Sequence, residues 1–305
     1  MTRGLSASAR RLAHAVVMTA TALACVSAQN APPRFDGARA LDQVRKLVAI
    51  GPRVAGSAGA ERARAFITDQ MTALGLQTRE QAFMAKTPVG VVRMVNLRVT
   101  LPGAAASGRL ILAGHYDTKL FQDVVFVGAN DGGSSAAFLI EIARVLKDRR
   151  NALPIELVFF DGEEAIVEWH KDNDHTYGSQ YYVDAARQDG TLKDIRALIL
   201  VDMIGDRDLR ILREPRSTRW LTDVIWQTAK KLKRPEFVDE EFAVEDDHVP
   251  FLDAGVQAID LIDLDYPDWH QAGDTVDKLS AASLQAVGDV LLAALPEIEK
   301  RLIKP

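Results

Sequence analysis

Four short apolar runs constrain the fold of this chain more than any other feature. They span residues 110–114, 155–160, 197–201 and 259–264, and each has the length and composition of a strand buried within a sheet. Segments with helical periodicity lie between them. Strands that alternate with helices form largely parallel sheets covered on both faces. The pattern therefore predicts an α/β fold, a three-layer α/β/α sandwich with a central mixed, mostly parallel sheet.

Side chains that bind metals follow these runs. Open α/β sheets bind ligands at the carboxyl ends of their strands. Any single Asp or His there could be a helix cap or an ordinary loop residue, but several together favour a metal site. Imidazole and carboxylate groups without thiolate suit zinc in a catalytic site that keeps one position open. The candidate ligands are His115, Asp131, Glu164, Asp202 and His270.

Two adjacent carboxylates, Glu163 and Glu164, stand directly after the run 155–160. Neighbouring side chains at the end of a strand point in different directions, so these two cannot perform the same task. One of them can bind a metal while the other faces the group that the metal activates. The doubled Glu therefore predicts a ligand next to a catalytic acid or base.

Other segments predict the surrounding elements. The strand-like segment 91–101 is predicted as an edge strand, closed by Pro102 and Gly103. The segment 131–135 opens a helix, which places Asp131 at or next to a helix N-terminus. Further helices are predicted over 60–74, 217–231 and 281–302.

The N-terminus has the composition of an export signal. Basic residues precede an apolar stretch at 12–26, and small residues then form a signal-peptidase site. Two alternatives are a membrane anchor and a lipoprotein acylated at Cys25. We expect an exported protein, periplasmic or secreted, cleaved after Ala28. The expected organisation is a signal peptide at 1–28, a linker at 29–37 and one catalytic domain at 38–305.

The charge balance is acidic, with 37 Lys and Arg against 42 Asp and Glu. Removal of residues 1–28 would take away three Arg and the only Cys, leaving 34 basic residues against 42 acidic ones. Proteins that bind nucleic acid show basic surfaces, so we expect no nucleic-acid partner. No segment after Val26 is expected to make a stable membrane span.

Several motifs together resemble the zinc aminopeptidase clan of M28 type, which also contains the animal-type glutaminyl-peptide cyclotransferases, or glutaminyl cyclases. The resemblance covers roughly residues 41–302. The matching motifs, in order, are Gly51-Pro52-Arg53 with Gly56-Ser57, His115-Tyr116-Asp117, Asp131, Glu163-Glu164, Asp202 and His270. The fold that this resemblance implies is the zinc aminopeptidase-like α/β/α sandwich.

The resemblance implies two possible metal arrangements. In the two-zinc aminopeptidases, Asp131 would bridge the ions. His115 and Asp202 would complete one ion and Glu164 and His270 the other, with Glu163 as general base. In the cyclases, one zinc would be held by the counterparts of Asp131, Glu164 and His270. Asp202 would then belong to a hydrogen-bond network.

Residues around these ligands resemble the cyclases more closely. Trp169 stands at the cyclase position after the doubled Glu, and Trp269 directly precedes His270, as the cyclase pocket tryptophan does. The segment 246–251 resembles the one that carries a second buried acid, here Asp246. The resemblance implies that Trp169, Trp269 and Tyr266 bind substrate.

Some residues depart from the animal cyclases. Tyr266 stands where a Phe is usual, and Glu245 replaces a common Gln. The spacing between Pro267 and Trp269 is one residue shorter than expected, and the segment 274–279 looks more like the peptidases. These departures keep the aminopeptidase reading open.

The resemblance implies a glutaminyl-peptide cyclotransferase that converts N-terminal Gln to pyroglutamate and releases ammonia. One zinc is expected, with Glu163 as the acid–base group and Asp202 and Asp246 as the carboxyl network. Its partners would be peptides or proteins with an N-terminal Gln, and the chain would be a monomer. The alternatives are an exported two-zinc aminopeptidase and a non-catalytic periplasmic binding protein. The last would lack a ligand or the base, and none is missing.

Overall fold

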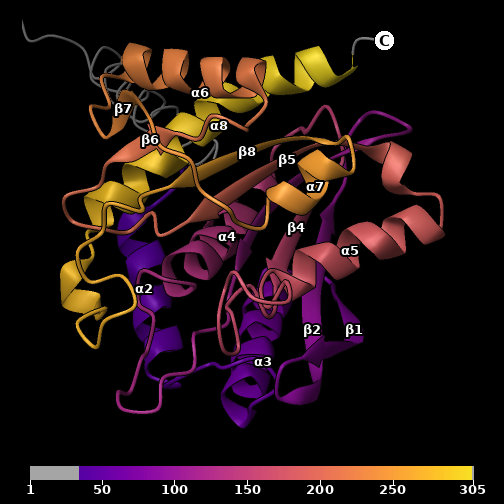
Figure 1. Cartoon of the computed structure of the whole chain (residues 1–305). Helices are drawn as coiled ribbons and strands as arrows, with labels where there is room; N and C mark the ends of the chain where they lie inside the picture. Colours follow the sequence, from indigo (N-terminus) through magenta and orange to yellow (C-terminus); the bar gives the residue numbers. More distant parts are fainter. Residues whose placement is uncertain (1–33, 304–305) are drawn as a thin grey trace, which may run out of the picture. The chain divides into compact units, whose positions relative to one another are not determined.

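A six-stranded mixed sheet forms the middle of the structure, a computed structural model that describes residues 34–303 (Figure 1). In spatial order, β4 pairs in parallel with β3, β3 with β5 and β5 with β8, whereas β1/β2 and β2/β4 are antiparallel. The prediction of a mixed, mostly parallel sheet is confirmed. The strands are β1 (Thr78–Thr87), β2 (Gly90–Leu101), β3 (Arg109–His115), β4 (Ile155–Phe160), β5 (Ile195–Asp202) and β8 (Gln257–Ile262).

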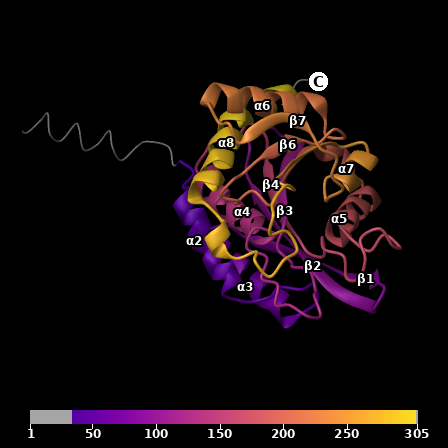
Figure 2. The ribbon, with the colours of Figure 1, turned by 60° about the vertical axis from the view of Figure 1, so that its left-hand side comes forward.

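Helices cover both faces of the sheet, which gives the three predicted layers (Figure 2). One face packs against a group of long helices: α2 (Gly37–Val48), α3 (Ala58–Ala73), α4 (Gly133–Leu146), α6 (Arg219–Leu232) and α8 (Ala281–Ile303). The other face packs against α5 (Tyr177–Gln188) and α7 (Val249–Asp253). The connections include two 3₁₀ turns, η1 (Leu192–Asp194) and η2 (Val276–Lys278), and a small parallel sheet of β6 (Ile211–Arg213) and β7 (Phe237–Glu241).

The central strands are buried because helices lie on both sides of them. All six residues of β4 are buried, and so are the last six of β3. Strands in this position read as continuous apolar runs rather than as alternating ones. For this reason the four apolar runs predicted the sheet, and the polar residues that follow them are easily recognised in the sequence.

The prediction that 91–101 forms an edge strand is wrong. β2 pairs with β1 on one side and with β4 on the other, so it lies inside the sheet. The true edge, β1, was not predicted from the sequence. Most of its side chains are exposed or half-buried, so it lacks an apolar pattern. β1 is held at this edge by antiparallel pairing with β2 in a hairpin, in which Thr87 lies opposite Gly90.

The ordered domain begins before residue 38. Phe35 is buried against Phe138, with ring centroids 4.9 Å apart, and the Asp36 side chain accepts N–H bonds from the first turn of α2. The C-terminal end of the expected linker at 29–37 is therefore part of the packed domain. The expected signal peptide at 1–28 lies outside the described residues.

Helix α8 corrects the statement that no segment after residue 26 could span a membrane. By length and composition alone, its 23 residues are sufficient, with a mean hydropathy of 1.3. Its apolar side chains, among them Leu284, Val287 and Leu291, are buried against the rest of the domain. The apolar composition of α8 is accounted for by its place in the core.

Replacing Phe35 with Ala is expected to destabilise the domain by about 3–5 kcal/mol, because removal of this buried aromatic side chain leaves a cavity beside Phe138. Urea unfolding followed by circular dichroism measures this change. Val91→Ala is the matched control, since the Val91 side chain is exposed and its loss should change the free energy of unfolding little. Equal stability of Phe35→Ala and the unchanged chain would place residue 35 outside the folded unit.

Candidate active site

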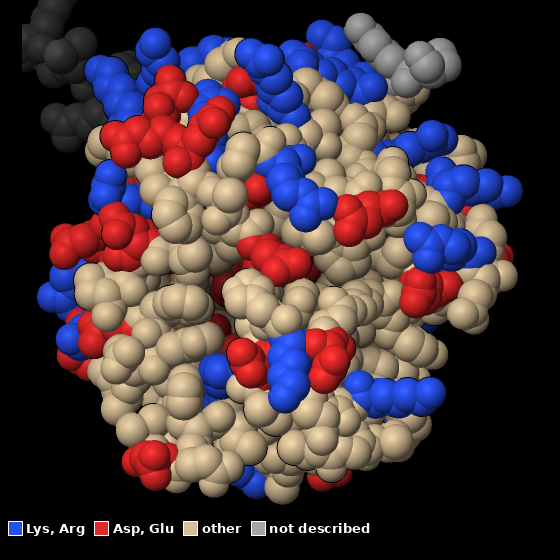
Figure 3. Space-filling view, viewed as in Figure 1, with Lys and Arg blue, Asp and Glu red and all other residues tan. Residues whose placement is uncertain are grey.

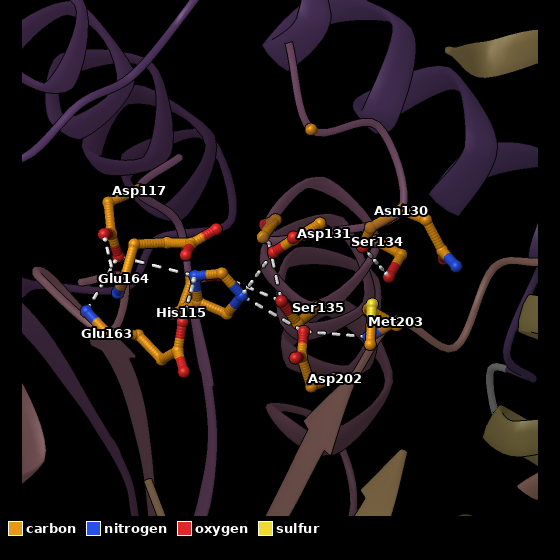
Figure 4. A network of polar contacts seen from close by, with 12 residues as sticks. His115, Asp117, Asn130, Asp131, Ser134, Ser135, Glu163, Glu164, Asp202 and Met203 are labelled. Carbon is orange, nitrogen blue, oxygen red and sulfur yellow. Dashed lines mark hydrogen bonds and ion pairs between the residues drawn. The ribbon is translucent and has the colours of Figure 1, made fainter. Parts of the chain in front are cut away.

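The predicted metal ligands meet at the carboxyl edge of the sheet. His115 is the last residue of β3, Asp202 is the last residue of β5, and Glu164 follows β4. Asp131 precedes α4 by two residues, and His270 comes from the loop after β8. Figure 4 shows His115, Asp131 and Asp202 pointing toward one another. Strands that are far apart in sequence thus deliver their terminal side chains to one place.

Asp131 lies between two histidines. Its Oδ1 is 3.3 Å from His115 Nε2, and its Oδ2 is 3.4 Å from His270 Nε2. His115 Nε2 is also 3.1 Å from Asp202 Oδ1, and His270 Nε2 is 3.2 Å from Glu164 Oε2. The five side chains therefore form two triads that share Asp131, each with its ligand atoms within 4.8 Å of one another.

These residues fit a divalent metal ion. Asp131 Oδ2 and Glu164 Oε2 are buried and receive no hydrogen bond from the described residues. A buried oxygen without a donor is costly, and a metal ion would supply the missing partner. Nitrogen and oxygen ligands in a group of three match a catalytic metal site with an open position.

The carboxylates of Asp131 and Glu164 favour a positive charge at the position of His270. Burial lowers the pKa of His270, but the neighbouring carboxylates of Asp131 and Glu164 outweigh burial and raise it to about 10. The same position can accept either a proton or a metal ion, so metal binding must release protons. The negative charge of the site thus favours a cation beside Asp131, Glu164 and His270.

Asp117 fixes the doubled Glu and the imidazole of His115. Its two carboxylate oxygens accept the backbone N–H groups of Glu163, at 3.2 Å, and Glu164, at 3.3 Å. The Oδ1 atom is also 3.4 Å from His115 Nδ1. Asp117 is buried, so these bonds are shielded from water. A group that orients metal ligands in this way tunes the site without touching the ion.

Asp274 performs the same task for Asp131. It accepts the backbone N–H groups of Asn130, at 2.8 Å, and Asp131, at 3.1 Å. The Tyr266 hydroxyl donates to Asp274 Oδ1 over 2.9 Å. Tyr266 is not among the residues that line the cavity over the site, and its role in binding substrate stays a prediction. Its ring is buried in a cluster with Met203, and its hydroxyl supports the ligand loop instead of lining the cavity.

The turn after Asp131 needs a glycine. Gly132 has a φ of 70°, a conformation that other residues rarely adopt. A Cβ added there would lie 2.4 Å from the Asp117 carbonyl oxygen and 3.0 Å from His115 Cε1. Gly132 therefore allows the start of α4 to approach the end of β3, which brings Asp131 next to His115.

A cavity of about 440 Å³ opens over the site. Its floor includes Glu163 and Asp246, and its walls include Trp169 and Trp269. On the face drawn in Figure 3 the surface is hollowed, and acidic atoms are visible within the hollow. The same face carries Lys and Arg interspersed with Asp and Glu rather than an extended basic patch.

The two tryptophans are held by neighbouring groups. The Trp169 ring stacks on His175 with centroids 4.3 Å apart, and its Nε1 donates to Glu245 Oε2 over 3.2 Å. The Trp269 ring stacks on His270 with centroids 4.4 Å apart. Trp269 therefore contacts a member of the metal triad, and both tryptophans line the cavity over it.

The acids on the cavity floor hold protons more tightly than free acids do. Burial raises the pKa of Glu163 well above its usual value, opposed by His115 and reinforced by Asp246. Burial, together with Asp260 and Asp202, also raises the pKa of Asp246. A carboxyl with a raised pKa is a stronger base when ionised, which suits it to take a proton from a reacting group.

Sequence reasoning missed two features of the site. The rings of Phe121 and Phe126 meet His270 edge-on, with centroids 5.7 and 5.9 Å from its ring. Their loop has no motif, so only tertiary packing reveals them. The second feature is a buried cluster of Glu214, His248 and Asp260 behind the cavity. The predicted motif at 246–251 includes His248, but its partners lie on other elements.

Comparison with family models matches residues 96–295 to peptidase family M28, the class of protein that this fold and site define. A solved glutaminyl cyclase from an Acidobacteriales bacterium is 43% identical, with a TM-score of 0.84, and the match covers 90% of this chain and 98% of that one. The glutaminyl-peptide cyclotransferase-like protein of Mus musculus is 31% identical over 287 residues, covering 83% of this chain and 73% of that protein.

A leucine aminopeptidase precursor from Bacteroides thetaiotaomicron is 25% identical, with a TM-score of 0.78, over 87% of this chain and 98% of that one. The nearer likeness is thus to proteins named as cyclases. The chain belongs to peptidase family M28 and, within it, to the glutaminyl-peptide cyclotransferase family. The family resemblance noted in the sequence is confirmed.

Glu164→Gln and His270→Ala are each expected to lose the metal, because either change removes one member of the triad with Asp131. Glu163→Gln, the neighbouring change, should keep it, since Glu163 belongs to neither triad. Elemental mass spectrometry after dialysis gives the metal content per chain, which is then compared among the three variants. Full occupancy in both Glu164→Gln and His270→Ala would mean that the ligands are other residues.

Proposed function

We propose that this protein is a zinc-dependent glutaminyl-peptide cyclotransferase that converts an N-terminal Gln to pyroglutamate. The observation that carries this proposal is the position of Glu163, on the floor of a tryptophan-walled cavity, beside the triad of Asp131, Glu164 and His270. The likeness to solved and curated glutaminyl cyclases supports it. The substrates are peptides or proteins whose first residue is Gln.

In this proposal Asp131, Glu164 and His270 hold one zinc ion. Zinc held there would supply a Lewis acid for the γ-carbonyl of the substrate Gln and positive charge for the oxygen on which negative charge develops. The orphaned oxygens of Asp131 and Glu164 are the atoms that would face the ion. Asp202 then serves the carboxyl network, as in the cyclase reading of the sequence.

Glu163 moves the proton that the reaction requires. The α-amine of the substrate attacks its own γ-carbonyl carbon, so a C–N bond forms as the bond to the amide nitrogen breaks. Glu163 takes a proton from the attacking amine and returns it to the amide nitrogen, which leaves as ammonia. Its raised pKa supports the first half of this task, because the carboxylate is then a stronger base toward the proton of the attacking amine.

Asp202 and Asp246 receive the leaving nitrogen. Both are buried, and both line the cavity next to Glu163. Carboxyls this close share protons and titrate as a set, so at least one can accept a hydrogen bond from the amide. They position the nitrogen that Glu163 protonates.

Trp169 and Trp269 shape the space for the substrate side chain. Cyclisation requires the γ-amide of Gln to fold back toward the α-amine. Walls that hold this bent form remove the entropy of finding it, an effect worth several kcal/mol in intramolecular reactions. Trp269 is 42% exposed, so part of its ring is free to contact a ligand.

One observation favours a second candidate, an exported two-zinc aminopeptidase. The triad of His115, Asp131 and Asp202 is complete and buried, so the residues for a second ion are present. In that reading Glu163 activates water against the first peptide bond. The similarity to a protein named as a leucine aminopeptidase precursor also supports this second candidate.

The proposal also includes export. Residues 1–28 would direct the chain out of the cytoplasm and be removed after Ala28, leaving a monomeric periplasmic or secreted enzyme without Cys. Such a protein depends for its stability on its core rather than on disulfides. The apolar core on both faces of the sheet is consistent with this expectation.

Glu163→Gln is expected to lower turnover by about 10²–10⁴-fold, because it removes the group that moves the proton. Thermal stability and metal content should stay close to those of the unchanged chain. Ammonia release from a Gln-initiated peptide measures the turnover. Near-normal turnover in this variant would rule out Glu163 as the acid–base group.

Paired peptides that begin with Gln and with Leu separate the two candidate enzymes. Mass spectrometry should show loss of ammonia from the first and no change in the second. Trp169→Ala should cut the first reaction severely with zinc still bound, because the wall that holds the bent side chain is gone. Shortening of the Leu peptide by one residue, without cyclisation of the Gln peptide, would establish the aminopeptidase instead.

A further inference from the structure

A buried cation, Arg53, lies close to the metal ligands and has no part in the reaction proposed above. Its side chain is shielded from water, at 0% exposed. It belongs to the Gly51-Pro52-Arg53 motif, which the proposed reaction does not use. A buried charge is costly unless other groups compensate it, so the contacts of Arg53 must account for its presence.

The guanidinium of Arg53 donates to main-chain carbonyl oxygens. Its Nε donates to the oxygen of Tyr116 over 2.8 Å. Its Nη1 donates to the oxygen of Val127 over 2.6 Å, and its Nη2 to that of Gly128 over 2.8 Å. A longer bond of 3.5 Å joins Nη2 to the oxygen of Asp131. One side chain therefore joins two separate segments of the chain through their backbones.

These two segments carry metal ligands. Tyr116 stands between His115, the last residue of β3, and Asp117, which accepts the backbone N–H groups of the doubled Glu. The second segment leads directly into Asp131, the ligand that the two triads share. The bonds of Arg53 thus fix the backbone around Asp131 relative to the backbone around His115.

The turn before Asp131 is shaped to meet the guanidinium. Gly128 has a φ of 49°, in the left-handed region that favours glycine. A Cβ added there would lie 2.4 Å from the carbonyl oxygen of Asp131 and 3.3 Å from Arg53 Nη2. Without that atom, the consecutive carbonyl groups of Val127 and Gly128 can both face one guanidinium. The conformation of this turn and the contacts of Arg53 therefore depend on each other.

The charge of Arg53 is balanced by acids of the site. Burial lowers the pKa of Arg53 to about 10, and the negative charges of Asp274, Asp117 and Asp131 act against that shift. The guanidinium therefore stays protonated at neutral pH. Asp117 and Asp274 also accept main-chain N–H groups next to the metal ligands, so the cation lies among the groups that orient those ligands.

We propose that Arg53 is a positioning residue for the metal site, which holds the turn before Asp131 against the segment of His115 and Asp117. The role rests on the proposed function, because it requires Asp131 as a zinc ligand. A guanidinium offers several donors in one plane, which three spaced carbonyl groups match, whereas the ammonium of Lys is a single point of charge. The geometry of Arg53, and not only its charge, should therefore matter.

Arg53→Lys keeps the charge and removes the planar fork. The turn before Asp131 should then lose its fixed position. Zinc affinity is expected to fall by about 10–100-fold, the usual cost of disturbing groups that orient metal ligands. Titration of zinc alone into the metal-free chain, in competition with a chelator of known affinity, measures this change.

Thr118→Val is a milder test of the same arrangement. The backbone N–H of Arg53 donates to Thr118 Oγ1 over 2.8 Å, and Val removes this acceptor while the guanidinium stays in place. Zinc affinity should fall in this variant too, by a smaller factor than in Arg53→Lys.

Arg109→Lys is the matched control. Arg109 is the first residue of β3, at the opposite end of the strand from His115. Its side chain is 17% exposed, and its Nε lies 2.8 Å from Glu156 Oε2. This variant loses a largely buried fork far from the ligands. Thermal stability should fall in both Arg variants, whereas zinc affinity should fall only in Arg53→Lys.

An unchanged zinc affinity in folded Arg53→Lys would overturn the positioning role. Should that variant fail to fold, an unchanged affinity in Thr118→Val would do so. Zinc affinity is measured without substrate, so a chain that binds zinc but releases no ammonia would contradict the proposed function alone.

If the unchanged chain binds no zinc, the proposed function fails, and hydrogen exchange of the metal-free chain then judges Arg53. The backbone N–H groups of residues 129–131 donate to oxygens of Asp274. They should exchange faster in Arg53→Lys, or in Thr118→Val if the first variant does not fold, than in Arg109→Lys. Equal exchange rates would contradict the positioning role.

Discussion

Buried negative charge is the constraint on which this structure depends. Asp131, Glu163, Glu164 and Asp202 are all buried at the carboxyl edge of the sheet, with two imidazoles among them. Like charges repel strongly where water is excluded, so the edge is stable only when cations balance it. The raised pKa of His270 reflects this excess of negative charge, and a divalent ion held by Asp131, Glu164 and His270 would balance it with more positive charge than a proton brings.

The scaffold fixes these acids through its backbone. Asp117 and Asp274 each accept two consecutive main-chain N–H groups, so they set the path of the segments that carry Glu164 and Asp131. Sites supported in this way keep their geometry better than sites on free loops.

The sequence predicted what depends on local pattern. Apolar runs that end in metal ligands predicted the sheet and the meeting of His115 with Asp202, because parallel strands end at one edge. It did not predict that Tyr266 turns inward, since its hydroxyl partner Asp274 is defined only by the fold. It also missed β1, whose exposed side chains carry no periodicity, and the partners of His248, which lie on distant elements. Pairings between distant buried polar groups have no sequence signal.

The central claim is that one zinc ion, held by Asp131, Glu164 and His270, supports cyclisation of N-terminal Gln. Titration of zinc into the metal-free chain, with ammonia release followed at each addition, tests this claim directly. Activity toward a Gln-initiated peptide should rise in proportion to the first equivalent of zinc and gain nothing from the second. Activity that appears only with the second equivalent, or no ammonia release at full zinc occupancy, would contradict it.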